Sequence, residues 1–402
     1  MSRTFAPKSF LRHTSNALLQ RYFHERGLLA DLEIAALGET DIKPVFEAYQ
    51  ALSDDVRTQV DADFSGVDRL AHAQGEQTIL DEARFHRLDL VDDFAGLHGF
   101  HDRSLLTFID HREVFDVASL FNDADLLSRR YWLVATSVPR IVPADDDESC
   151  DRLGGAIGRY LRAAEGRGEP CKVEVYLRVN RHYYFAYPQD YGATHMEYVA
   201  DKLERRQLRP AFEIIFCYAK DEGTLDVYFD GSRKRAAELR EIFSREILRQ
   251  DFATLQGERI FDLNRLKQRG FEFTYGTDSG IVDVRIKKLR CQTIGMKERL
   301  TLEPDPGAGR VGIYDQLDRV FQTDRGATTS QSDKLPLSLV NITQAGLTVE
   351  FRRTAGRGRP TRSFGLSYPN ACSLNHDGRD GIIRQMLIAS GIERRPLVQP
   401  AA

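Results

Sequence analysis

The sequence predicts an α+β protein: an all-helical N-terminal domain followed by antiparallel-sheet modules in strand–strand–helix order. Three observations predict this class. Apolar residues follow helical spacing up to about residue 135, period-2 alternation of apolar residues begins only after residue 170, and a pattern of two strands followed by a helix then recurs three times. Antiparallel sheets with helices on one face satisfy all three. The predicted domains are residues 1–135, 150–255 and 256–402.

The N-terminal part carries helix signals throughout. Residues 8–29 place large apolar side chains near the helical period, and residues 30–135 contain several short segments of the same kind, separated by glycines. Ser53, followed by Asp54 and Asp55, is typical of a helix start, because a serine caps the free N–H groups and acids favour the first turn. We therefore expect helices alone in this region.

A linker is expected at residues 134–149, which contain Pro139, Pro143 and an acidic run. One helix follows at 149–165. The first sheet module has alternating strands and then an amphipathic helix. The expected elements are strands at 173–179, 181–187, 212–218 and 225–229 and a helix at 233–248.

Two further units repeat this order without repeating its residues. In the last unit, Leu347, Val349 and Phe351 alternate with polar residues, which is typical of a half-buried strand. Pro369 ends the second strand of that unit, and a short amphipathic helix follows. The expected elements are strands at 281–290 and 297–303, a helix at 311–321, strands at 341–353 and 362–368, and a helix at 379–390.

Composition indicates a globular protein. The 402 residues are 42% hydrophobic and 29% charged, and no apolar run reaches the length of about 18 residues that a membrane span needs. The five cysteines are scattered, odd in number and form no C-x-x-C pair, which argues against a disulfide framework or a structural zinc site. The start of the chain shows no signal-peptide pattern. We expect a cytoplasmic protein with no membrane contact and no cofactor.

Acidic and basic residues are distributed unevenly along the chain. The net charge is −4, but residues 30–125 carry 22 acidic and seven basic side chains, whereas residues 331–402 carry ten basic and five acidic ones. Such a division suggests that the two parts have different partners, or that one part faces the other.

Basic side chains on the last two units form the candidate nucleic-acid site. Arginine forks match phosphate geometry, and their binding releases counterions from a polyanion. Aromatic residues, which would stack on bases, are missing from the arginine-rich turn, so we expect contacts mainly to the backbone. The alternative is a solvated loop without a partner. The predicted residues are Arg285, Lys287, Lys297, Arg299, Arg352, Arg353, Arg357, Arg359 and Arg362.

Two enzymatic alternatives stay open. A hydrolase acting on a nucleotide or nucleic acid could use the junction at 375–380, where His376, Asp377, Arg379 and Asp380 form an acid/base set, although such a run more often caps a helix. It could instead use a metal held by the cluster of histidines with an aspartate. That cluster contains His86, His98, His101, Asp102 and His111. The phosphate-loop, dinucleotide, G-x-S-x-G, H-E-x-x-H and zinc-deaminase patterns are absent.

The sequence therefore favours a non-enzymatic binding protein. Its basic α+β part would contact DNA or RNA, and its acidic helical part would contact a protein partner. A bacterial regulator or a component of a defence or mobile-element system would fit this description. A pure scaffold, in which the acidic half docks on the basic half, is the third alternative.

Overall fold

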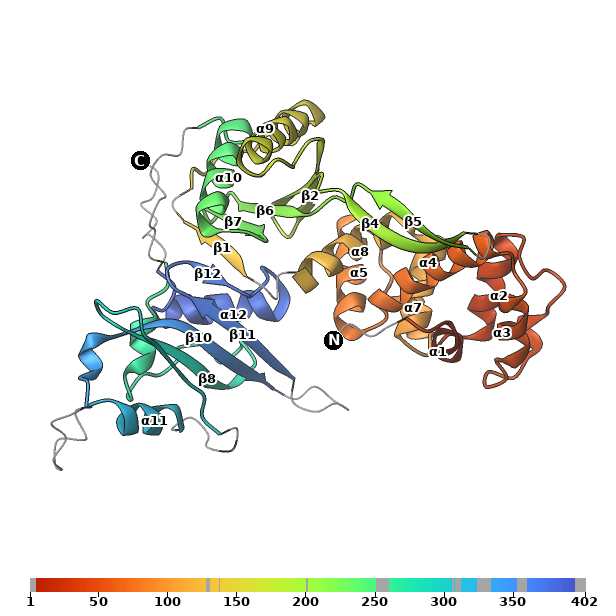
Figure 1. The fold of residues 1–402 in the computed structure, drawn as a ribbon. Helices are drawn as coiled ribbons and strands as arrows, with labels where there is room; N and C mark the ends of the chain where they lie inside the picture. Colours follow the sequence, from red (N-terminus) through yellow and green to blue (C-terminus); the bar gives the residue numbers. More distant parts are fainter. Residues whose placement is uncertain are drawn as a thin grey trace. The chain divides into compact units, whose positions relative to one another are not determined.

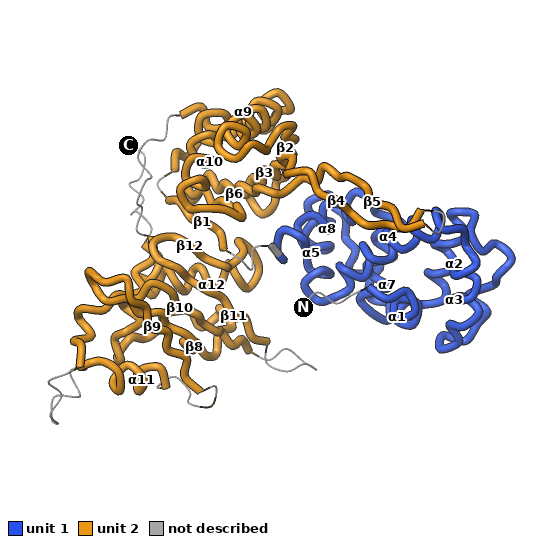
Figure 2. Tube along the Cα trace, viewed as in Figure 1, with its two compact units in different colours: residues 1–127 blue, residues 128–402 orange. Residues whose placement is uncertain are grey.

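The computed structural model describes residues 5–127, 131–136, 138–199, 202–250, 260–305, 307, 312–323, 334–352 and 360–394. The chain divides into two compact units, residues 1–127 and residues 128–402 (Figure 2). Each unit is described by itself.

The first unit is helical. Its apolar stripes meet in one core, in which the rings of Phe10 and Phe64 stack with centroids 4.3 Å apart and Tyr22 packs on Phe64. Asp54 and Asp55 lie in the first turn of α4, as the predicted helix start requires. The helices are α1 (Pro7–His13), α2 (Asn16–Glu25), η1 (Ile34–Ala36), α3 (Lys43–Gln50), α4 (Asp54–Leu70), α5 (Ala73–Phe85), α6 (Val91–Ala95), α7 (Phe100–Asp110) and α8 (Arg112–Leu127).

The second unit is built on a ten-stranded antiparallel sheet in the order β2-β3-β6-β7-β1-β12-β11-β10-β8-β9 (Figure 1). A separate hairpin, β4 (Ala193–Val199) and β5 (Lys202–Leu208), is inserted between β3 and β6. The sheet strands are β1 (Trp132–Ala135), β2 (Cys171–Arg178), β3 (Arg181–Pro188), β6 (Ile214–Ala219), β7 (Thr224–Phe229), β8 (Ile281–Thr293), β9 (Arg299–Leu302), β10 (Val340–Phe351), β11 (Thr361–Ser367) and β12 (Ala371–Cys372).

Helices α9 (Asp147–Glu165) and α10 (Arg233–Glu246) cover one face of the half formed by β2, β3, β6, β7 and β1. Phe243 of α10 stacks on Phe216 of β6, with ring centroids 4.9 Å apart. Alternate residues of each strand enter this core, because successive side chains of a strand point to opposite faces.

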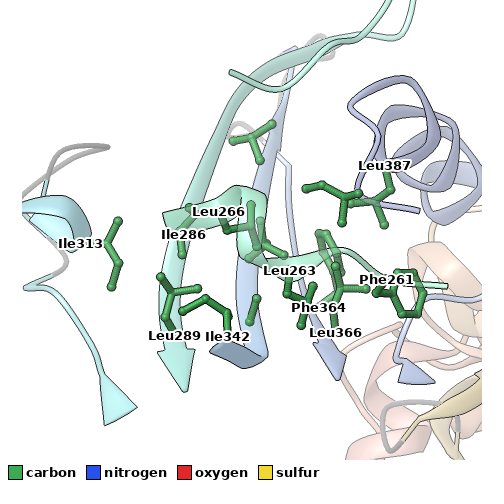
Figure 3. Packing of buried hydrophobic residues seen from close by; sticks show 14 of the residues in the cluster. Phe261, Leu263, Leu266, Ile286, Leu289, Ile313, Ile342, Phe364, Leu366 and Leu387 are labelled. Atoms are coloured by element: carbon green, nitrogen blue, oxygen red, sulfur yellow. The ribbon is translucent and has the colours of Figure 1, made fainter. Parts of the chain in front are cut away.

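In the other half of the sheet, the core lies on the face opposite to the one that α9 and α10 cover. The register β1–β12–β11 places Leu133, Ala371 and Ser367 on one face, whereas Leu366 enters the second core on the other face. This core lies between β8, β10 and β11 and the elements η2 (Leu263–Lys267), α11 (Gly312–Val320) and α12 (Gly378–Ala389) (Figure 3). The helices of the two halves therefore lie on different faces of one continuous sheet.

The structure shows the predicted mixture of a helical N-terminal unit and antiparallel strands with helices. Several details differ. The helical unit ends at residue 127 and not at 135, because Trp132–Ala135 forms β1, a short strand that spans the end of the predicted helical domain and the first two residues of the predicted linker. The sheet also continues across the predicted boundary at residue 255, since β12 hydrogen-bonds to β1. The β4–β5 hairpin was not predicted.

The described residues bear on two further expectations, the absence of a membrane span and the absence of a disulfide framework. None of their helices combines the length and the apolar character that crossing a membrane requires. The five cysteines are all free thiols, and burial raises the pKa of Cys217 and of Cys372 to about 12.

Candidate nucleic-acid interface

One face of β9, β8, β10 and β11 points away from the second core, and we call it the outer face. The described helical elements of this half pack on the other side, so polar side chains and glycines line the outer face. Its strand residues are Asp283, Arg285, Lys288, Arg290 and Gln292 of β8, Arg299 and Thr301 of β9, Asn341, Gln344, Gly346, Thr348 and Glu350 of β10, and Thr361, Ser363, Gly365 and Ser367 of β11.

A bulge in β8 decides which basic residues share the outer face. Ile286 pairs with Leu347 and Lys288 pairs with Gly346, so Lys287 is an extra residue between two pairs. The alternation therefore shifts by one, and the side chains that follow on the outer face are Lys288 and Arg290. A Cβ on Gly346 would lie 3.2 Å from the Cβ of Lys288, which places both on the same side.

Tyr131, just before β1, lies against Gly365 on this face. Gly365 pairs with Gly346, and a Cβ on Gly365 would lie only 2.3 Å from the Tyr131 hydroxyl oxygen. Glycine at residue 365 therefore lets the tyrosine contact the strand backbone. The residue stays 37% exposed. Burial raises the pKa of Tyr131, while the positive charges of Arg290 and Lys288 act in the opposite direction.

The cations of the outer face differ in how far they are neutralised. Arg285 lies 2.6 Å from Asp283 and 3.1 Å from Glu350. Lys288 lies 2.6 Å from Glu303.

By contrast, no carboxylate of the described residues forms an ion pair with Arg290 or Arg299. Arg233, at the start of α10, donates to the Ser367 hydroxyl at 2.9 Å and to the Tyr368 carbonyl at 2.7 Å. The free positive charge is thus concentrated at Arg290 and Arg299, with Arg233 at the border of the face.

The structure brings together only part of the predicted residue set. Arg285 and Arg299 lie on the outer face, and Lys287, Lys297 and Arg352 are exposed. Arg353, Arg357 and Arg359 lie outside the described residues.

Arg362 lies on the opposite face of the sheet. It pairs with Val349 of the second core, and its guanidinium donates to both carboxylate oxygens of Asp380 at 2.7 and 2.6 Å. It therefore does not belong to the outer face.

The site residues predicted from the sequence do not include Tyr131, Arg233, Lys288 and Arg290. Lys288 and Arg290 are visible as basic residues in the sequence, but strict alternation from Arg285 assigns them to the buried face. Tyr131 and Arg233 come from segments far away in the chain, and only the strand order places them beside β11. The pair Gly346 and Gly365, each within a strand, is the one local signal of a close approach.

The junction at 375–380 is a buried ion-pair cluster. The His376 imidazole Nε2 lies 2.6 Å from a carboxylate oxygen of Asp226 on β7, and Arg384 of α12 lies 3.2 Å from the same oxygen. The His376 side chain is only 2% exposed. Its ring packs edge-on against Trp132, with centroids 4.8 Å apart.

The cluster has strongly shifted pKa values. Burial, together with the charge of Arg384, lowers the pKa of His376 to about 4. Burial alone would raise the pKa of Asp226, but Arg384 and the hydrogen bond with His376 outweigh it and lower that pKa to about 2. An ionised aspartate, a neutral histidine and a charged arginine follow.

The neighbouring residues of the junction also have protein partners. Asp377 lies 2.7 Å from Arg178 of β2, and Arg379 lies over the Phe351 ring with its guanidinium carbon 5.5 Å from the centroid. Asp380 binds Arg362 and also accepts the Asn375 backbone N–H at 2.8 Å. These contacts tie the loop before α12 to β2, β7 and β11.

Two histidines of the predicted cluster in the helical unit each contact a different carboxylate. His101 lies 2.9 Å from Asp68, and His86 lies 3.1 Å from Glu82. Asp102 accepts the Ser15 backbone N–H at 2.8 Å. In the part of the chain that the structure describes, no three His, Cys, Asp or Glu side chains are grouped so that they could hold a metal.

Comparison with known proteins gives no relative from which a function could be transferred. No family model, no curated protein and no solved structure matches this chain.

Proposed function

We propose that the chain binds single-stranded DNA or RNA on the outer face of β8, β9, β10 and β11. The observation that carries the proposal is the arrangement of Tyr131 over Gly365 with Lys288 and Arg290 beside it, on the sheet face opposite to the one that η2, α11 and α12 cover.

This arrangement provides both kinds of contact that single strands use. Arg290 and Arg299 have no carboxylate partner among the described residues, so a phosphate would not have to displace one. Tyr131 adds a partly exposed aromatic ring, and bases stack on such rings whatever their identity. The exposed Ser363 hydroxyl, which is hydrogen-bonded to the buried Thr348 hydroxyl, adds a further polar group to this face.

A flat platform suits a single strand better than a duplex. The bases of a duplex are stacked on each other, so a tyrosine lying on a sheet cannot reach their faces, whereas a single strand can splay its bases. Contacts to phosphates and base faces carry little sequence information, so we expect the outer face itself to accept strands of any sequence. The proposal concerns binding and includes no catalytic step.

The first prediction concerns salt dependence. Arg290→Ala together with Arg299→Ala should weaken binding of a short single-stranded homopolymer about tenfold or more at low salt. The slope of log K against log salt concentration should become shallower by about 1.4, because about 0.7 is lost per phosphate contact on a single strand. Fluorescence anisotropy with labelled DNA and RNA strands at several salt concentrations measures both values.

A matched control removes the same charge elsewhere in the second unit. Lys172→Ala with Arg319→Ala changes two exposed cations that lie outside the outer face, and it should leave the slope nearly unchanged. If the two double variants lost the same amount of affinity and of salt slope, binding would depend only on the net charge of the chain. Absence of binding by the unmodified chain at low salt would overturn the proposed function.

The second prediction separates stacking from charge. Tyr131→Leu keeps an apolar side chain against Gly365 but removes the ring, so affinity should fall by about 1–3 kcal/mol while the salt slope stays the same. An unchanged affinity, in a variant whose thermal unfolding matches that of the unmodified chain, would remove Tyr131 from the interface.

A further inference from the structure

A pocket of about 480 Å³ lies at one end of the outer face. Gln292 of β8 and Asn341 of β10 line it, and the two residues are paired across the strands. Cys291 and Ile342, their neighbours, enter the core, so Gln292 and Asn341 belong to the outer face. The volume lies within the range of about 300–1,000 Å³ that is typical of small-ligand sites.

The side-chain amides of this pocket are held in place. Asn264 of η2 donates from Nδ2 to the Asn341 Oδ1 at 3.0 Å and accepts the Ile342 backbone N–H at 2.9 Å. The Gln292 Nε2 donates to the Met296 carbonyl at 3.0 Å.

These hydrogen bonds use the oxygen of the Asn341 amide and the nitrogen of the Gln292 amide, and they leave the other polar atom of each amide available. Among the described residues, the Asn341 Nδ2 has no acceptor and the Gln292 Oε1 has no donor. The pocket thus offers one free donor and one free acceptor from neighbouring strands. A nucleobase edge carries the complementary groups.

The remaining lining is apolar or neutral. Ile294 and Tyr368 are the exposed apolar residues at the pocket, whereas Phe261, Leu263 and Ile342 lie behind them, buried in the second core. The single lining carboxylate, Asp262, is paired with Arg394 at 2.5 Å. A pocket without net charge favours a flat, neutral group over a phosphate.

We infer that this pocket receives one nucleobase of the strand that lies on the outer face, an inference that rests on the proposed function. Gln292 follows Arg290 by two residues on the same face of β8, a distance of about 7 Å. A phosphate held at Arg290 therefore lies within reach of the nucleotide whose base would enter the pocket. On the other side, Arg233 binds the Tyr368 carbonyl and so connects the pocket with Ser367 of the outer face.

Base preference is the property that tests the pocket. Asn341→Asp keeps the oxygen that accepts from Asn264 and replaces the free donor by an acceptor, and Asn341→Ala removes the amide without adding charge. Gln207→Glu, on the exposed strand β5, is the control for the added charge. Anisotropy should be measured with homopolymers of each base and with an abasic strand of the same length.

The unmodified chain should prefer one homopolymer over the others by about fivefold to tenfold, the size of one or two hydrogen bonds. Both Asn341 variants should reduce this preference to nearly one. Asn341→Ala should leave the affinity for the abasic strand unchanged, and Gln207→Glu should keep the preference.

Failure of the pocket and failure of the proposed function give different results. Tight binding of all strands without base preference, or a preference that Asn341→Ala leaves intact, overturns the pocket and leaves the outer face as the binding site. If no strand binds, the proposed function is overturned, and thermal unfolding with free nucleosides then decides the pocket. A stabilisation that Asn341→Ala abolishes supports it, and no stabilisation by any nucleoside overturns it.

Discussion

Asp226→Ala should lower the free energy of unfolding of the second unit by about 3–5 kcal/mol, the largest loss that we expect from a single substitution. Asp226 and Arg384 are both buried, and removing the carboxylate leaves the guanidinium charged without its counter-ion. Burying such a charge alone costs far more than losing a hydrogen bond between neutral groups. Urea unfolding, followed by tryptophan fluorescence, measures the loss.

Trp132 serves as the fluorescence reporter of this cluster. Trp132 is the one tryptophan of the chain, and its ring packs against His376, so its emission follows the cluster itself. Fluorescence therefore reports the unfolding of the second unit, whatever the helical unit does.

A double variant distinguishes an unpaired charge from lost packing. Asp226→Ala with Arg384→Met removes both charges, so it should be clearly less destabilised than the sum of the two single variants. Additive losses would indicate that the two residues stabilise the fold independently, which contradicts the ion-pair argument. Lys172→Ala, an exposed cation paired with exposed Asp151, should change stability by less than about 1 kcal/mol and serves as the control.

The sequence predicted local elements better than their assembly. Alternation along residues 341–353 and 362–368 is a property of neighbouring residues, and β10 and β11 appear there with ends shifted by one or two residues. The strand β1 has four residues, all buried, without alternation, and it lies beside two prolines. Its place in the sheet comes from pairing with β7 and β12, contacts that no local pattern encodes.

The same limit applies to the candidate site. Arg285 and Arg299 could be assigned to an exposed strand face from the sequence, but the bulge at Lys287 depends on the pairing of β8 with β10. The glycine at residue 365 gains a meaning only when Tyr131 is seen to lie on it, and a Cβ on Gly346 would meet Lys288. Likewise, the run at 375–380 has the composition of an acid/base set, and its burial against β7 follows from the position of α12 in the fold.

Acidification should destabilise the second unit through His376 by about 3 kcal/mol between pH 7 and pH 4. The imidazole has a folded pKa of about 4, below its ordinary value of 6.5. Between these values the unfolded chain binds a proton that the folded chain does not, so stability is lost as pH falls through this window. A shift of this size corresponds to about 3 kcal/mol, at about 1.4 kcal/mol per pKa unit.

His376→Gln isolates this contribution, because the variant keeps a hydrogen-bonding side chain but cannot titrate. The unmodified chain should lose about 3 kcal/mol more than the variant between pH 7 and pH 4. Asp226 acts in a separate, lower window: its folded pKa of about 2 lies below the ordinary 3.8, so its contribution is lost only as pH falls below about 4.

A gain of stability on acidification, instead of the expected loss, would contradict the assignment of a neutral His376. If Asp226 held His376 protonated, the folded pKa would be raised, and the unmodified chain would gain stability relative to His376→Gln on acidification from pH 7. We expect the loss, because Arg384 already supplies a positive charge to Asp226 and a second buried cation would face it at close range. A gain in urea unfolding, followed through Trp132, would therefore overturn the assignment of a neutral histidine and with it the charge pattern of the whole cluster.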